Sequence, residues 1–193
     1  MDLVGIAAGV CSRDELVLGD KIKNADAIVG IESSGIHSNG LSLARKVLLR
    51  RHSLREIIPE LGRSIGEELL EPTRIYAKAA LEVLRNSEIH GLAHITGGSF
   101  SKIDRIVSQA KLGGEIGQLP RPHRIFQMIQ REGRVSNSEM YKTFNMGIGL
   151  VVICPEPRAD QVIRVFNRHG QGATRIGKVR KKPGIRVRTG QVG

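Results

Sequence analysis

Two short segments of the chain consist almost wholly of small polar residues and glycine. Residues 33–40 supply three hydroxyls, the imidazole of His37 and the amide of Asn39. Residues 94–98 supply a second imidazole, the hydroxyl of Thr96 and two glycines. Successive small residues let backbone N–H groups point into one concavity, where they bind anions such as phosphate. Both segments are therefore candidate anion-binding loops. Ordinary turns and caps are the alternative, because neither standard phosphate-binding glycine fingerprint is present.

Other polar residues do not predict a metal site. His90 and His94 are four positions apart, but Gly91 stands where a zinc protease would carry its glutamate. Cys11 and Cys154 lie in no Cys-x-x-Cys pair, so both are interpreted as buried thiols. We expect no metal to be bound by these residues.

Hydrophobic periodicity predicts the elements that position the two loops. A continuous apolar run is typical of a buried strand, and apolar spacings of 3, 4 and 7 are typical of one helix face. Ser38 or Asn39 can cap the helix after the first loop, and Ser136 with Glu139 matches a capping box. Strands are expected at residues 26–32, 89–95 and 147–154, and helices at 41 to about 50–52, 73–86 (with Ile75 on its apolar face), 100–107, 123–131, 136–143 and 159–168.

The end of the chain is expected to form a closing hairpin. Ile176 and Val179 alternate with basic residues, Pro183-Gly184 forms a turn, and alternation resumes at Ile185. With the preceding order of strands and helices, this pattern indicates an α/β domain.

Charge and composition restrict the class of protein. The chain of 193 residues has a net charge of +11. Seven basic residues and no acidic ones lie in residues 171–193, which leaves 23 bases against 19 acids before them. A solvated basic face is the preferred interpretation, because four Phe, two Tyr and no Trp provide few platforms for stacking on nucleic-acid bases. The longest apolar run, residues 146–154, is too short to span a membrane. No signal peptide is visible, so we expect a cytoplasmic location.

Four longer strings resemble phosphoribosylformylglycinamidine cyclo-ligase, or AIR synthetase, a family of purine biosynthesis. They are SSGIHSNGLSLARK at residues 33–46, LEPTRIY at 70–76, HGLAHITGG at 90–98 and EMYKTFNMGIG at 139–149. They occur in the family's order, and the likeness extends to residues 2–5 and 175–179. The resemblance therefore covers nearly the whole chain.

The resemblance implies a mixed β-sheet with helices packed mainly on one face. Residues 1–25 correspond to a junction segment and residues 26–193 to the family's C-terminal domain. The family's first domain, which holds magnesium and ATP, is expected to be absent, and it or a partner is expected to cover the other sheet face. The implied enzyme uses ATP to activate the formyl amide oxygen of its substrate, after which an amidine nitrogen closes the imidazole ring.

The resemblance also assigns site residues by position. His37 and His94 are candidates for proton handling or phosphate neutralisation, because the pKa of histidine lies nearest neutrality. Ser99 stands where many relatives have a third glycine. The substrate- and phosphate-binding candidates are Ser34, Gly35, Ser38, Asn39, Gly40, Thr96, Gly97, Gly98, Asn145 and Gly147.

Three functions are consistent with these patterns. The first is the substrate-binding half of the cyclo-ligase, which takes a phosphorylated ribonucleotide and is inactive without a separate N-terminal half or a second copy. The second is a non-catalytic module that binds RNA or another polyanion through the basic tail. The third is another ATP-dependent member of the same superfamily, such as a thiamine-phosphate kinase or a selenophosphate synthetase.

Overall fold

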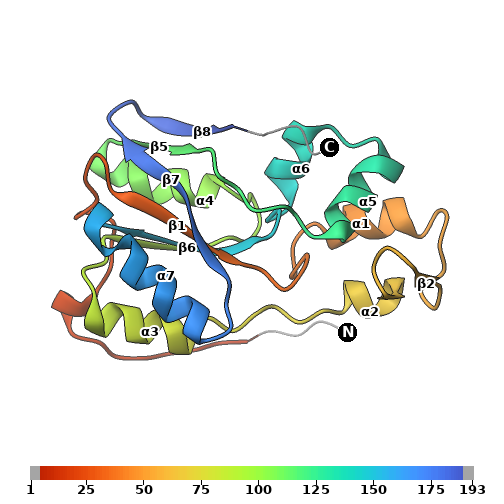
Figure 1. The fold of residues 1–193 in the computed structure, drawn as a ribbon, viewed down its shortest axis with the longest axis horizontal. Helices are drawn as coiled ribbons and strands as arrows, with labels where there is room; N and C mark the ends of the chain where they lie inside the picture. The colour runs from red at the N-terminus through yellow and green to blue at the C-terminus, as the bar shows by residue number, and fades with distance from the viewer. Residues whose placement is uncertain (1–4, 189–193) are drawn as a thin grey trace.

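The main feature of the fold is a mixed six-stranded sheet, shown in Figure 1. The computed structural model describes residues 5–188, so the likeness at residues 2–4 and the last five residues of the basic tail lie outside it. The strand order is β4-β6-β1-β7-β5-β8. Only β5 and β8 pair in parallel among these strands. The strands are β1 (Ala27–Glu32), β4 (Gly91–His94), β5 (Gly113–Ile116), β6 (Ile148–Cys154), β7 (Ala173–Arg180) and β8 (Gly184–Val187).

Helices cover both faces of this sheet, with more of them on one face than on the other. Alternate residues of β1 point to opposite sides, so that Ile28 joins one core and Val29 the other. The first core includes side chains of α1, α2, α4, α5 and α6, and the second includes side chains of α3 and α7. The helices are α1 (Leu41–Leu48), α2 (Ile65–Leu69), α3 (Ala77–Asn86), α4 (Ser101–Val107), α5 (Arg124–Gly133), α6 (Asn137–Thr143) and α7 (Ala159–Arg168).

The expected mixed α/β sheet is confirmed. The expectation that an absent domain or a partner covers the second face is wrong, because α3 and α7 of this chain pack there. None of the described helices has the length and apolar character needed to cross a membrane. The interpretation of both cysteines as buried holds for Cys154, whereas Cys11 is exposed.

One helix cap and one helix start differ from the sequence prediction, although α1 begins at Leu41 as expected. The residue that precedes α1 as its N-cap is Gly40, in the left-handed region at φ 78°, and no side chain caps this helix. The helix predicted from residue 73 begins at Ala77, and Ile75 is 80% exposed. By contrast, Ser136 caps α6, since its hydroxyl accepts from the N–H of Glu139. The reciprocal half of the predicted capping box is not formed, and the Glu139 carboxylate instead accepts from the Thr143 hydroxyl at 2.9 Å.

The predicted closing hairpin is wrong. β7 and β8 do not pair with each other, because β5 lies between them and pairs with both. The periodicity of a four-residue strand with two glycines is too weak to reveal it in the sequence. Gly113 of β5 has no side chain, and an added Cβ would overlap backbone atoms of Lys182 and Gly184. This close approach explains how β5 fits between the two strands.

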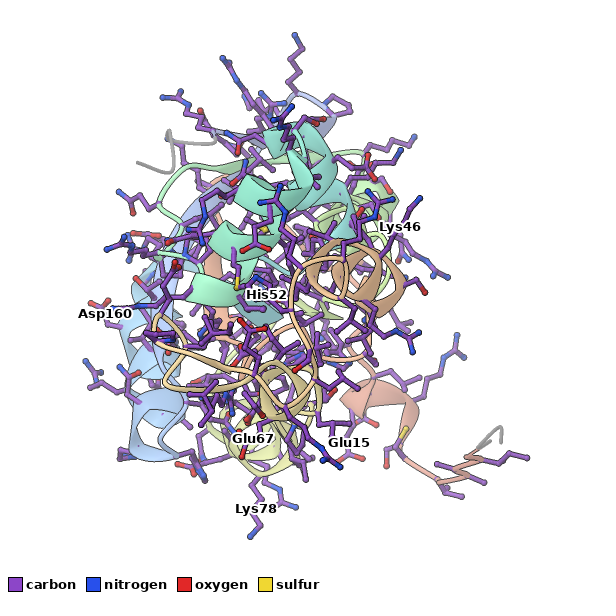
Figure 2. All side chains as sticks on the ribbon, turned by 90° about the vertical axis from the view of Figure 1, so that its right-hand side faces the viewer. Glu15, Lys46, His52, Glu67, Lys78 and Asp160 are labelled. Atoms are coloured by element: carbon purple, nitrogen blue, oxygen red, sulfur yellow. The ribbon has the colours of Figure 1, made fainter. Side chains whose placement is uncertain are left out.

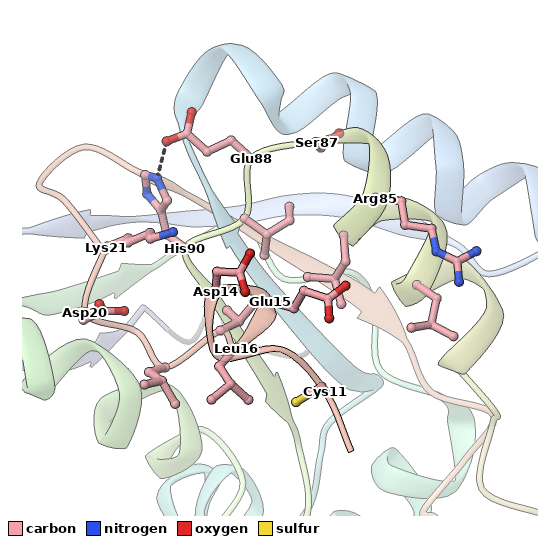
Figure 3. A pocket seen from close by; sticks show the side chains of 15 residues that line it. Cys11, Asp14, Glu15, Leu16, Asp20, Lys21, Arg85, Ser87, Glu88 and His90 are labelled. Carbon is pink, nitrogen blue, oxygen red and sulfur yellow. Dashed lines mark hydrogen bonds and ion pairs between the residues drawn. The ribbon is translucent and has the colours of Figure 1, made fainter. Parts of the chain in front are cut away.

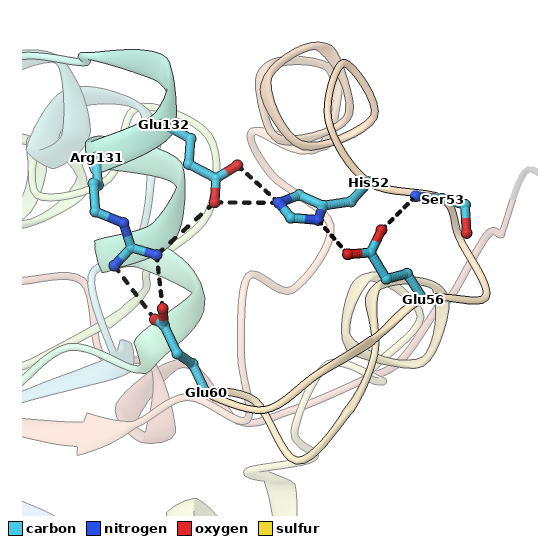
Figure 4. A network of polar contacts seen from close by, with 6 residues as sticks. All are labelled: His52, Ser53, Glu56, Glu60, Arg131 and Glu132. Atoms are coloured by element: carbon cyan, nitrogen blue, oxygen red, sulfur yellow. Dashed lines mark hydrogen bonds and ion pairs between the residues drawn. The ribbon is translucent and has the colours of Figure 1, made fainter.

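The segment between α1 and α3 contains short elements that the sequence did not predict. These are the two-stranded sheet of β2 (Ile57–Ile58) and β3 (Arg63–Ser64), followed by α2. A polar network ties this segment to α5, as Figure 4 shows. His52 lies between Glu56 at 2.9 Å and Glu132 at 3.2 Å, and Arg131 pairs with Glu60 at 2.9 Å. Three short 3-10 helices complete the described elements: η1 (Arg13–Glu15), η2 (Ser108–Ala110) and η3 (Glu156–Arg158).

Candidate functional site

Asn145 fixes the start of the first loop. Its Oδ1 accepts hydrogen bonds from the Ser33 hydroxyl at 3.1 Å and the Gly147 N–H at 2.9 Å. Its Nδ2 donates to the carbonyls of Gly35 at 2.9 Å and Ile36 at 3.1 Å. These four bonds use the full capacity of the amide, and the side chain is buried. Asn145 therefore positions the loop and has no hydrogen bond left for a ligand.

His37 is held in the loop as a neutral imidazole. Its Nε2 accepts from the backbone N–H of Ser34 at 3.1 Å and from that of Arg74 at 3.5 Å. Burial, together with the charges of His94, Arg74 and His123, lowers the pKa of His37 to about 4. The proton of the neutral ring consequently sits on Nδ1, which is buried and has no partner among the described residues.

Three rings meet where the first loop approaches β4. The ring centroids of His37 and His94 are 6.5 Å apart, and Tyr76 lies 6.5 Å from His37 and 6.1 Å from His94. The Tyr76 hydroxyl donates to the Glu32 carbonyl at 2.9 Å, and burial raises the pKa of Tyr76. Desolvation lowers the pKa of His94. Gly149 on β6 makes this arrangement possible, because an added Cβ would overlap the Tyr76 hydroxyl and lie 2.8 Å from His37 Cε1.

The second loop presents backbone N–H groups. The Ser99 N–H donates to the Thr96 carbonyl at 2.8 Å, and the Ser99 hydroxyl donates to the Phe144 carbonyl at 2.6 Å. Ser99 has a φ of +48° and is fully buried. The N–H groups of Thr96, Gly97 and Gly98 donate no hydrogen bond within residues 5–188, and both glycines are exposed. These N–H groups are available to an anion.

The two loops touch each other at Asn39 and Gly97. An added Cβ on Gly97 would lie 3.2 Å from Asn39 Oδ1. Directly after Asn39, Gly40 packs on the Phe144 ring so closely that a side chain would overlap the ring. Because α1 begins here without a side-chain cap, its first N–H groups lie at the same place as the second loop. The first turn of α1 and the second loop are therefore neighbours, and both have N–H groups without a partner among the described residues.

The remaining residues predicted for the site have mainly structural contacts. The Ser34 hydroxyl donates to the Pro72 carbonyl at 2.6 Å. Gly35 is buried beside the Glu71 side chain, and Ser38 is exposed. Gly147, at φ +92°, is buried beneath the first loop, and its carbonyl accepts from the N–H of Ser33 at 2.9 Å.

Sequence reasoning missed three residues of this region. Tyr76 ends the LEPTRIY string, and its position there was the available signal. His123 precedes α5, and its Nε2 donates to the Ser33 carbonyl at 3.0 Å. Gly149 ends the EMYKTFNMGIG string, and its position there was likewise the available signal. Each of the three supports the first loop or its ring cluster.

Both ring nitrogens of His90 already have hydrogen-bond partners, so His90 has no nitrogen free to share a ligand with His94. His90 is buried, with Nδ1 2.6 Å from Asp26 and Nε2 2.9 Å from Glu88, at the edge of a cavity of about 540 Å³ shown in Figure 3. That cavity lies between residues 11–21 and the end of α3, and its lining contains neither anion-binding loop. No group of three or more metal-ligating side chains suited to an ion occurs within residues 5–188.

The basic tail is partly neutralised. Arg175 pairs with Glu156, and Arg188 pairs with Glu115 at 2.5 Å. Lys178, Lys181 and Lys182 form no ion pair with another described residue. These contacts agree with a solvated basic face.

Comparison with protein families gives a match over residues 24–190 to AIR synthase related protein, C-terminal domain. The chain is 48% identical over 183 residues to a phosphoribosylformylglycinamidine cyclo-ligase of Methanocaldococcus jannaschii, covering 93% of this chain and 51% of that protein. It is 44% identical over 186 residues to the protein of the same name from Thermococcus kodakarensis, covering 96% and 53%. The chain thus spans about half the length of the curated relatives it matches.

Solved structures share the fold at low sequence identity. A thiamine-monophosphate kinase from Stenotrophomonas maltophilia K279a has a TM-score of 0.66 and 15% identity, over 92% of this chain and 54% of that one. E. coli HypE, a hydrogenase maturation protein, has a TM-score of 0.59 and 18% identity, over 91% and 50%. These likenesses establish the fold alone.

Proposed function

The chain belongs to the family of AIR synthase related proteins, as their C-terminal domain, and on this premise we propose that it is the substrate-binding half of a phosphoribosylformylglycinamidine cyclo-ligase. In this role the chain binds formylglycinamidine ribonucleotide, and ATP-dependent ring closure converts this substrate to aminoimidazole ribonucleotide in purine biosynthesis. We place this activity in the cytoplasm. The observation that supports this function best is the contact of the two loops at Asn39 and Gly97, next to N–H groups that have no partner among the described residues.

The free N–H groups donate hydrogen bonds to an anionic group of the substrate. Backbone N–H groups at the start of α1 and at Gly97 and Gly98 are already oriented, so binding requires little reorganisation. Asn145 and Ser99 fix the two loops from below through buried hydrogen bonds. In this proposal Asn145 and Gly147 act through the loop and not by direct contact.

His37 and His94 serve hydrogen bonding and proton handling more than charge neutralisation. The pKa of each ring lies below its ordinary value, so both rings are neutral at pH 7. A neutral imidazole can donate a proton at one nitrogen and accept one at the other. This suits a ring closure in which an amidine nitrogen must lose a proton as the bond forms.

Magnesium and ATP belong to a different part of the active enzyme in this proposal. ATP supplies the phosphoryl group that activates the formyl amide oxygen. Magnesium prefers carboxylate oxygens, and residues 5–188 offer no cluster of them at the loops. Glu71, the carboxylate beside Gly35, is paired with Arg63 at 2.6 Å. We place magnesium and ATP on the part of the active enzyme that corresponds to the half of the relatives' length not matched by this chain, and turnover requires that part.

Isothermal titration with formylglycinamidine ribonucleotide tests the proposed function. The wild-type chain should show saturable binding, and His94→Ala should weaken it about tenfold or more. His169→Ala is the matched control, because His169 pairs with Glu82 on α3 at 2.7 Å. Absence of saturation at millimolar ribonucleotide, with the chain folded by circular dichroism, would overturn the proposal. Equal losses in the two variants would overturn the assignment of the loops.

A further inference from the structure

A second cavity lies between the C-terminal ends of α1 and α5. Gly133 allows the two helices to meet, because an added Cβ would lie 2.7 Å from Val47 Cγ2 and 2.9 Å from Val135 Cγ2. The cavity has a volume of about 440 Å³. Leu43, Val47 and Val135 provide its apolar surface. Figure 2 looks onto this side of the molecule, with Lys46 projecting from α1.

Four cations surround this cavity. They are Lys46, Arg50, Arg51 and Arg134, and none forms an ion pair with another residue of the described chain. The lining also contains the carboxylate of Glu132, but this group is turned to His52 at 3.2 Å and lies 3.8 Å from Arg131. The cations are therefore not neutralised by their neighbours.

Helix ends account for only part of this positive charge. Each helix C-terminus carries roughly half a negative charge, which favours a cation in the last turn. Lys46 lies in the last turn of α1 and satisfies that preference. Arg50, Arg51 and Arg134 lie beyond the ends of α1 and α5. The cations still outnumber the negative charges around the cavity.

We propose that this cavity binds the oligophosphate group of a nucleotide or of an inorganic oligophosphate. The planar guanidinium of arginine donates paired hydrogen bonds that fit phosphate oxygens, and two or more linked phosphates match several separated cations. The cavity is distinct from the two loops of the proposed function. Those loops meet at the N-terminus of α1, whereas the cavity is at the other end of that helix, roughly 12 Å away for eight residues.

Titration of the folded chain with three probes tests this inference. ATP, inorganic tripolyphosphate and adenosine are titrated separately into the wild-type chain and into a triple variant, Lys46→Gln/Arg50→Gln/Arg134→Gly. Glycine suits position 134, because Arg134 has a φ of +48° and loses only its side chain. The matched control is Arg85→Gln/Arg105→Gln/Arg164→Gln, which removes three exposed cations from α3, α4 and α7.

The site is supported if tripolyphosphate or ATP binds the wild type saturably. The affinity should then fall about tenfold or more in the triple variant and stay unchanged in the control variant. Tighter binding of ATP than of tripolyphosphate identifies a nucleotide as the ligand, and equal binding identifies the oligophosphate alone. The inference is overturned if both triple variants lose affinity equally. It is also overturned if only adenosine binds, or if no probe saturates at millimolar concentration. The triple variant should bind formylglycinamidine ribonucleotide as the wild type does, which separates this test from that of the proposed function.

Discussion

The side chains of Ser33 and Asn145, which are 112 positions apart in the chain, are joined by a buried hydrogen bond of 3.1 Å. Ser33 directly follows β1, and Asn145 lies just before β6, its antiparallel neighbour. The bond therefore closes the end of the β1–β6 pair at the point where the first loop leaves the sheet. The geometry of the candidate site depends on this closure.

Replacement of Asn145 should destabilise the fold. Asn145→Ala leaves the buried carbonyls of Gly35 and Ile36 without their side-chain donor, and the expected loss in the free energy of unfolding is about 3 kcal/mol. Urea denaturation measures it. Asn86→Ala is the control, since Asn86 bonds Glu82 on an exposed surface and should cost under about 1 kcal/mol. Equal small losses in both variants would contradict the role of Asn145.

His37 should make the protein less stable in mild acid. The pKa of His37 is about 4 in the folded state, below its ordinary value near 6.5, so the unfolded chain binds the proton more readily. Stability is therefore present above pH 6.5 and is lost as the pH falls toward 4, by up to about 3 kcal/mol. An NMR titration should show a His37 midpoint far below 6, and a midpoint near 6.5 would contradict this prediction.

His52 should have the opposite pH dependence. The hydrogen bond to Glu56, aided by Glu132, raises the pKa of His52. Its contribution is therefore complete below about pH 6.5 and is lost as the pH rises through the raised pKa. His52→Gln should destabilise the fold by about 0.5 kcal/mol at pH 6 and by less at pH 9, as measured by urea denaturation. A loss that is the same at both pH values would show that the charge of His52 contributes nothing through its pairs with Glu56 and Glu132, shown in Figure 4.

Two substitutions at Ser99 should separate backbone strain from hydrogen bonding. Ser99→Ala keeps a side chain at φ +48° and removes the bond to the Phe144 carbonyl, so it should cost about 2 kcal/mol. Ser99→Gly removes the same bond but relieves the left-handed backbone by roughly 1 kcal/mol, so it should cost less. Thermal unfolding of the two variants gives the comparison. A larger loss for glycine than for alanine would contradict it.

The sequence predicts those parts of the fold that depend on local patterns. The buried run of β6, the apolar face of α7 and the cap at Ser136 each follow from periodicity or residue type. Pairing order is not local, and so the position of β5 between β7 and β8 could not be inferred. At the site, composition indicated the two loops, because glycine and small polar residues mark them. It could not show that the amide of Asn145 is fully used, since its partners at Ser33, Gly35 and Ile36 are distant in sequence.

The central place of β1 has a consequence for how the chain folds. β1 is the first strand of the sheet to be synthesised, but both strands that pair with it, β6 and β7, come from residues 148–180. Until those residues have left the ribosome, both edges of an apolar strand remain unpaired, which favours association with other chains. The many contacts between distant residues also slow folding relative to helical proteins of this size. A nascent chain that stops before residue 148 is therefore expected to associate with other chains through the unpaired edges of β1.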